Sequence, residues 1–395
     1  MKYRIESIDI VRGIAMILMA LDHVRDFLHI EAFTADPLDL QTTTPGLYFT
    51  RWITHLCAPI FVFLSGTSIY LQSLRKDRKE LAVFLIKRGA WFIIAEWTII
   101  ALGWTFNPFF NLFPFQVIWA VGSSMVIMGL LLQANLSYRL ILGLGLVLVC
   151  GHNLLDIPES APGFQAGFLW DFLHSGTGAV YPIGGNRFVF LIYAFPVWTG
   201  VMMLGYSAGI FFTENYSPEK RRNVLLKLGA FLLLFFAALR ATNLYGDPVD
   251  WAPQKNLLFS FLSFINVDKY PASLLYLSLT LGLTLLMLAA FESVQNKITG
   301  IFKVYGRTAF FYYILHIYLI HIIATCFFFA RGHLMTEAIA YAQQLPFLFV
   351  VPGEGLSLAG VYGIWIGVVV ILYPLCLWYD RYKTNHREKW WLSYL

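Results

Sequence analysis

Apolar runs of about 20 residues recur along the whole chain and constrain its fold more than any other feature. A run of about 20 apolar residues is what an α-helix needs to cross the hydrocarbon core of a bilayer. Ten such runs lie at 8–28, 48–72, 83–104, 114–132, 137–154, 188–212, 224–244, 272–291, 308–329 and 357–379. The sequence therefore predicts an all-α, polytopic membrane helix bundle of about ten spans. We expect one domain over residues 1–395.

Composition excludes several other classes of protein. Charged side chains make up 13% of the 395 residues and hydrophobic side chains 58%. This charged fraction is about half that of a soluble domain, and the chain is too apolar to stay disordered. The four cysteines lie far apart inside apolar runs, which is unlike a disulfide framework. Basic residues are scattered between the runs, so the expected partner is the lipid bilayer and not nucleic acid.

The distribution of Lys and Arg predicts the orientation in the membrane. With the N-terminus in the cytoplasm, the inner segments hold 21 of the 28 basic residues and the outer segments hold seven. Such an excess of basic residues is typical of cytoplasmic loops. Both termini are therefore expected inside. One span more or fewer stays open, because 242–271 and 331–357 contain half-length apolar stretches.

The first apolar run carries ionisable residues at membrane depth, where they are costly and mark functional sites by default. Arg12 and His23 are eleven residues apart, so they share one helix face at a separation of about 16 Å along the axis. Asp26 follows His23 by three residues and can hydrogen-bond its imidazole, while Asp22 and Arg25 form a second such pair. A histidine oriented by a carboxylate is typical of a general base. The candidate catalytic residues are thus His23, Asp26 and Asp22, unless the cluster is a structural network that ties helices together.

The ninth run holds Tyr313 and His316 one turn apart, followed by His321. A lone histidine on an apolar helix is more often a core residue than a catalyst. Two histidines together with Arg307 make a functional role and a packing role equally well supported.

A metal site is not expected. His316 and His321 are five residues apart and point about 140° away from each other, unlike a ligand pair spaced by four residues. The remaining candidates can converge only through tertiary structure: His29, His55, His152 and His174.

Basic residues at the cytoplasmic helix ends are candidates for binding the phosphates of a nucleotide cofactor. Lys87 and Arg88 lie at the start of the third run, and Arg12, Lys303 and Arg307 lie at other inner ends. The positive-inside bias alone accounts for any single one of them.

Four separated motifs carry a family resemblance. They are RIESIDIVRGIAMILMALDHVRDF, APIFVFLSGTSIYL, KYPASLLYLSLTLG and YGRTAFFYYILHIYLIH. Together they resemble the signatures of the heparan-α-glucosaminide N-acetyltransferase catalytic-domain family, in its bacterial branch. The Arg-Gly pair, the histidine eleven residues after the arginine and the later Phe-Leu-Ser-Gly run are also similar to the membrane acyltransferase type 3 family.

The resemblance implies transfer of an acyl group from acetyl-CoA to an amino sugar or glycan on the far side of a bacterial inner membrane. The first-helix histidine regarded as catalytic in the type 3 family matches His23. In the eukaryotic lysosomal enzyme the proposed histidine follows the first helix, which makes His29 a second candidate. Arg12 would then hold a phosphate of CoA near the cytoplasm, with the thioester near His23. His29, Tyr313 and His316 are the candidates for contacting the acceptor.

Other function classes stay open. A transporter or proton-coupled permease would use His23, Asp22 and His316 as a proton relay. A non-catalytic scaffold is the third possibility. The absence of an internal repeat, the register of Arg12 with His23 and the motif set favour an acyltransferase acting on oxygen or nitrogen. The sequence leaves the acceptor and the oligomeric state open, a homodimer included.

Overall fold

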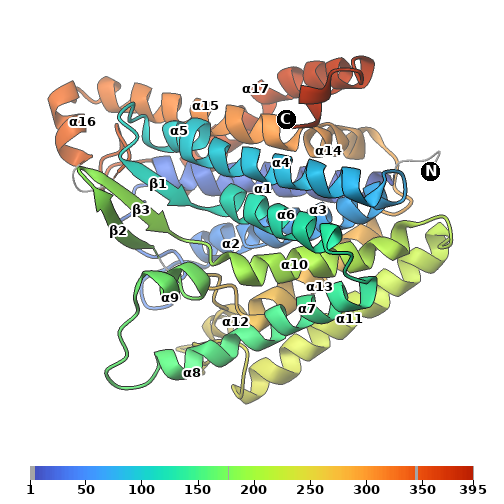
Figure 1. Ribbon diagram of the computed structural model, residues 1–395. Coiled ribbons are helices and arrows are strands. Elements are labelled where there is room, and N and C mark those ends of the chain that lie inside the picture. The colour runs from blue at the N-terminus through green and yellow to red at the C-terminus, as the bar shows by residue number, and fades with distance from the viewer. Residues whose placement is uncertain (1–4, 177, 343–345, 395) are drawn as a thin grey trace. The chain divides into compact units, whose positions relative to one another are not determined.

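Each of the ten apolar runs contains a helix in the computed structural model of the chain (Figure 1). The structure describes residues 5–176, 178–342 and 346–394. Six helical segments are long and apolar enough to cross a bilayer: Pro45–Ser73, Tyr138–Glu159, Phe195–Phe212, Pro218–Thr242, Ala309–Ala330 and Leu358–Asn385. The chain is an all-α, polytopic membrane protein, as the sequence predicts.

The first helices are α1 (Glu6–Leu28), α2 (Pro45–Thr54), α3 (Cys57–Ser73), α4 (Arg78–Ala95), η1 (Glu96–Ile100), α5 (Ala101–Thr105) and α6 (Val117–Gln133). Then follow α7 (Tyr138–Gly151), η2 (His152–Leu155), α8 (Asp156–Glu159), α9 (Phe168–Leu173), α10 (Phe195–Ala208), η3 (Gly209–Phe212) and α11 (Pro218–Thr242). The last helices are α12 (Leu257–Ile265), α13 (Leu274–Ala290), α14 (Lys297–Arg307), α15 (Ala309–Ala330), α16 (Met335–Tyr341), α17 (Leu358–Asn385) and η4 (Trp390–Ser393).

A small sheet and short helices occupy the long segments between the apolar helices. The strands β1 (Leu112–Phe115), β2 (Ala179–Gly184) and β3 (Arg187–Leu191) form one sheet in the order β1-β3-β2. β2 and β3 are antiparallel. The half-length apolar stretches of the sequence form α12 and α16, of nine and seven residues. Neither is long enough to cross a bilayer, because a helix rises about 1.5 Å per residue.

The chain divides into two compact units. The first comprises residues 1–11, 58–96 and 114–294, and the second comprises 12–57, 97–113 and 295–395. In the first unit, α6 packs against α4 and α10, α7 packs against α10, and α11 packs against α13. In the second unit, α15 packs against α5, α14 and α17.

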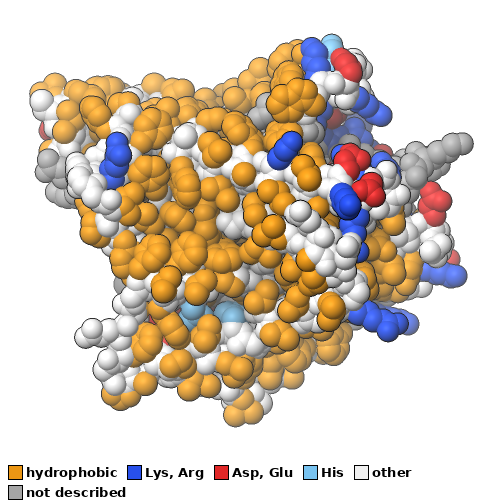
Figure 2. Space-filling view, in the orientation of Figure 1, with side chains coloured by type: hydrophobic (Ala, Val, Ile, Leu, Met, Phe, Trp, Pro, Cys, Tyr) orange, Lys and Arg blue, Asp and Glu red, His pale blue; other side chains and the backbone are white. Residues whose placement is uncertain are grey.

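Close backbone contact joins α4 to α6 in the first unit. A Cβ atom added to Gly89 would overlap the carbonyl oxygen of Gly122 on the facing helix. Small residues at such crossings let membrane helices pack through their backbones, because lipid supplies no hydrophobic force between helices. In contrast, only 22% of the most apolar 18-residue stretch is buried in the segment Tyr138–Glu159, which contains α7, and the same holds for α11. Figure 2 shows a surface dominated by hydrophobic side chains, as contact with lipid requires.

Arg240, near the end of α11, has a structural role. Its side chain is buried and donates to the backbone carbonyls of Val249, Ser263 and Asn266, at 2.6, 3.1 and 2.6 Å. Its Nη1 also lies 3.6 Å from Asp247 Oδ1. The guanidinium thereby satisfies carbonyls at the end of α12, which would otherwise be left without donors.

Candidate active site

His23 of α1 and His316 of α15 form a buried pair in the second unit. Nδ1 of His23 lies 2.7 Å from Nε2 of His316, and the two rings are nearly parallel, with centroids 4.9 Å apart. The two residues are 8% and 0% exposed. A hydrogen bond between two groups this buried is strong, because the surrounding medium is of low polarity.

The hydrogen bonds of the pair determine which nitrogen is basic. Nδ1 of His316 lies 2.9 Å from the carbonyl oxygen of Tyr312, which can only accept, so this nitrogen carries the hydrogen. In neutral His316 the Nε2 atom is then the acceptor, and Nδ1 of His23 must donate to it. This tautomer, inferred from the hydrogen-bond network, leaves Nε2 of His23 as the basic atom of the ring.

Aromatic rings surround His23. The ring of Trp104, from α5, meets His23 edge to face at 4.7 Å, and Tyr313 does so at 6.2 Å. These rings reduce the access of water and hold the imidazole in one orientation. Tyr313 was a sequence candidate, whereas Trp104 was missed because nothing in its local sequence separates it from the other eleven tryptophans.

A buried ionic cluster lies on the last turns of α1. Arg25 Nη2 lies 3.0 Å from Asp22 and 2.6 Å from Asp26, so the predicted pairing of Asp22 with Arg25 is confirmed. Arg51, from α2, lies 2.5 Å from the second oxygen of Asp22. Opposite charges must pair in this way when they are buried. The hydrogen bond expected from Asp26 to His23 stays a prediction, and Arg51 was not among the sequence candidates.

His29 follows α1 directly and is also buried. The backbone around it pairs with a distant segment, since Leu356 N–H donates to Leu28 and Ile30 N–H donates to Leu356, at 2.6 and 3.1 Å. Nδ1 of His29 accepts the backbone N–H of Glu31 at 3.3 Å. Burial lowers the pKa of His29, which favours its neutral form. Both first-helix candidates are thus buried: His23 is paired with a second histidine, and His29 is held by backbone contacts.

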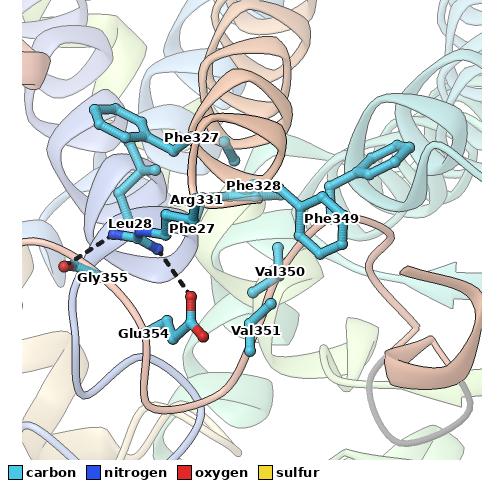
Figure 3. A pocket seen from close by; sticks show the side chains of 11 residues that line it. Phe27, Leu28, Phe327, Phe328, Arg331, Phe349, Val350, Val351, Glu354 and Gly355 are labelled. Atoms are coloured by element: carbon cyan, nitrogen blue, oxygen red, sulfur yellow. Dashed lines mark hydrogen bonds and ion pairs between the residues drawn. The ribbon is translucent and has the colours of Figure 1, made fainter. Parts of the chain in front are cut away.

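A pocket opens one turn beyond His23 (Figure 3). Phe27 lines it, and the ring of Phe27 stacks against Trp104 at 5.4 Å. Its polar wall is made by Arg331, which donates to the carbonyl of Gly355 at 3.1 Å and lies 3.5 Å from Glu354. The remaining lining residues are mostly apolar: Leu28, Ala324, Phe327, Phe328, Phe349, Val350 and Val351. The pocket therefore combines aromatic faces with one charged pair.

Two arginines flank a close helix crossing at the other end of α1. A Cβ atom added to Gly13 would overlap the carbonyl oxygen of Phe302 and would lie 3.1 Å from Gly306 N, on α14. Arg12 precedes Gly13 and Arg307 follows Gly306, so the crossing brings the two sequence candidates to neighbouring helix segments. Arg307 lies 3.5 Å from Asp380.

The chain matches one family model. The model for heparan-alpha-glucosaminide N-acetyltransferase, catalytic, covers residues 4–238. The chain belongs to this family. It is accordingly a transmembrane acetyltransferase. No curated protein matches it.

The residues that match the family model include only one member of the histidine pair. The matched region contains α1 with His23, whereas His316 lies beyond its end. Lys87 and Arg88 also fall within the matched region, on α4 in the first unit, where Arg88 lies 5.3 Å over the ring of Phe92. Their role in binding a cofactor stays a prediction.

Proposed function

We propose that this acetyltransferase moves an acetyl group from cytoplasmic acetyl-CoA to an amino sugar or glycan on the opposite side of the membrane. The observation that carries the proposal is the hydrogen bond between His23 and His316, fixed by the carbonyl of Tyr312. It provides a basic Nε2 atom on His23 inside a buried aromatic site. General bases of this kind contribute about 10²–10⁴-fold to rate.

In the proposed reaction, Nε2 of His23 accepts the proton of an acceptor hydroxyl or amine as that group attacks the thioester carbonyl. The tetrahedral intermediate collapses, the C–S bond breaks, and the thiolate of CoA leaves. His23 returns the proton to the thiolate, so the products are the acetylated acceptor and free CoA. In the alternative route, Nε2 of His23 itself attacks the thioester, the C–S bond breaks and the thiolate of CoA leaves. The acceptor then attacks the acetyl-imidazolium, the bond from Nε2 to the acetyl carbon breaks, and the acceptor proton passes to the thiolate. In both routes His316 is a positioning residue that fixes the tautomer of His23.

The donor half-site is proposed at the crossing of α1 and α14. Arg12 and Arg307 flank this crossing, and guanidinium groups bind phosphate oxygens through paired hydrogen bonds. Arg12 and His23 are separated by about 16 Å along α1, a distance that a pantetheine arm covers. The thioester would therefore reach His23 while the charged nucleotide stays at the cytoplasmic end.

The acceptor half-site is proposed at the pocket of Phe27, Arg331 and Glu354. The pocket as it stands has room for little more than a water-sized group, so only one end of an acceptor, such as a hydroxyl, would enter between its aromatic faces and its charged pair. Phe27 links it to the histidine pair through Trp104. The proposal also includes ten spans, both termini in the cytoplasm, and a bacterial inner membrane as the location.

Sealed vesicles test the transmembrane step. In right-side-out vesicles, acetyl-CoA loaded inside should label an impermeant amino-sugar acceptor added outside. Acetyl-CoA added only outside should give no label, because the donor is too charged to cross the bilayer. Detergent should abolish this asymmetry. Equal labelling from both sides of intact vesicles would mean that donor and acceptor bind on one side, and the transmembrane mechanism would be wrong.

A further inference from the structure

A cluster of three metal-ligating side chains lies in the first unit. It consists of Asp156 and Glu159, at the two ends of α8, and His174, directly after α9. One donor atom from each lies within 4.8 Å of the others. Nε2 of His174 is 2.9 Å from Asp156 and 3.3 Å from Glu159. Among the described residues, no other such group of three or more meets this criterion.

His174 provides an independent observation that points to a ligand. Its side chain is 1% exposed, yet neither ring nitrogen makes a hydrogen bond to any described residue. Nε2 nevertheless faces two carboxylate oxygens. A neutral nitrogen lone pair in that position would be repelled by both oxygens. The repulsion is removed when this nitrogen carries a hydrogen or binds a cation that it shares with the two carboxylates.

Neighbouring side chains hold the carboxylates in place. Asn153 donates a hydrogen bond to Oδ2 of Asp156 at 2.7 Å. The other carboxylate oxygen of Asp156, Oδ1, faces Nε2 of His174. Trp170 Nε1 donates to Glu159 at 3.2 Å. Residues that hydrogen-bond ligands and fix their orientation are a regular feature of metal sites.

A second histidine lies close to the cluster. Nδ1 of His152 is 3.3 Å from the carbonyl of Val149, so this nitrogen donates and Nε2 holds the lone pair. That Nε2 is buried and makes no hydrogen bond to the described residues. The ring of His152 is 6.0 Å from the ring of His174. His152 is therefore a candidate for a fourth ligand.

We propose that Asp156, Glu159 and His174 bind a divalent transition-metal ion, with zinc the best match. Zinc takes nitrogen and carboxylate ligands in four-coordinate sites, and three ligands from the chain leave a position for water or His152. The carboxylate side chains are 21% and 37% exposed, so the ion can enter from solvent. The ion would connect the segment after α8 to the end of α7. This proposal differs from the sequence-based expectation that the chain holds no metal site.

Metal content of the purified full-length protein tests the site. After removal of metal with a chelator and equilibration with zinc, the protein should retain one zinc per chain after desalting. Saturation should raise Tm by about 3–5 °C. Calcium should not replace zinc, because it prefers an all-oxygen shell.

The matched variants are H174A, D156N and H333A. His333 also lies near two carboxylates, at 3.4 Å from Glu337 and 3.0 Å from Glu354, but there its Nε2 makes hydrogen bonds. H174A and D156N should lose the bound zinc and the rise in Tm, while H333A should keep both. D156N preserves the shape of the side chain, so it separates loss of a ligand from loss of folding. Failure of the unaltered protein to retain zinc, or equal retention in D156N, would overturn the proposal.

Discussion

His316 accepts a hydrogen bond from His23 across 293 residues of sequence, with 2.7 Å between Nε2 of one ring and Nδ1 of the other. Nδ1 of His316 donates to the carbonyl oxygen of Tyr312, so Nε2 of His316 accepts from His23. The basic atom of the pair is therefore Nε2 of His23. On this relationship we base the choice of His23 over His29 and the proposed positioning role of His316.

Replacement of His23 should separate the two first-helix candidates. H23A removes the basic nitrogen, and we expect acetyl transfer to fall by at least about 10²-fold while acetyl-CoA binding persists. H29A should retain most activity. Steady-state rates and CoA-induced thermal stabilisation of both variants check this prediction. Activity of H23A within about threefold of the unaltered protein would exclude the role of His23.

Replacement of His316 should affect kcat more than either KM. H316L removes the acceptor for His23 Nδ1–H, and we expect kcat to fall by about 10–10³-fold. H316Q keeps an acceptor oxygen and should restore part of the loss. The KM for acetyl-CoA should change little in either variant, and the pH profile of H316L should shift. Equal loss in both variants with an unchanged pH profile would indicate a packing role only.

Replacement of Arg12 should weaken donor binding alone. A lost charge-assisted hydrogen bond costs about 1.5–3 kcal/mol, so R12A should raise the KM for acetyl-CoA by about 10–150-fold. R331A, at the acceptor pocket, should instead raise the KM for the acceptor. Kinetics with each substrate varied in turn distinguish the two. A change in acceptor KM alone for R12A would assign Arg12 a structural role.

Gly13 should tolerate no side chain. A Cβ atom there overlaps the carbonyl of Phe302, so G13A must move α1 away from α14, at a cost of about 1–3 kcal/mol. Gly300 lies on the same α14 and has open space around its position, so G300A serves as the control and should not destabilise. The Tm of both variants in detergent measures the difference. Equal Tm values would contradict the close crossing.

Asp268 should make stability depend on pH. Its backbone N–H donates to Asp247 at 2.9 Å, and burial followed by the Asp247 carboxylate raises the pKa of Asp268 to about 7. Between about pH 4 and 7 the folded protein keeps a proton that the unfolded chain has released. The free energy of unfolding should therefore fall as pH rises through this window and level off above it. D268N should flatten this part of the Tm profile, and an unchanged slope would show that other groups cause it.

The sequence by itself determined the helices. Ten apolar runs can satisfy their backbone polar groups in lipid only as helices, so their positions follow from length and composition. The register of Arg12 and His23 on one face also follows from the geometry of a single helix. The pairing of Asp22 with Arg25 is likewise a local event, three residues apart, and the structure contains it.

Only the tertiary structure decided what surrounds His23. Its partner His316 and the neighbouring ring of Trp104 come from two other helices, and Arg51, which pairs with Asp22, comes from a third. No local pattern relates them to α1. The same holds for the convergence of His174 with Asp156 and Glu159. Helix formation depends on contacts within about four residues, which a sequence displays directly. A site depends on which helix faces pack together, and side-chain packing over hundreds of residues determines that.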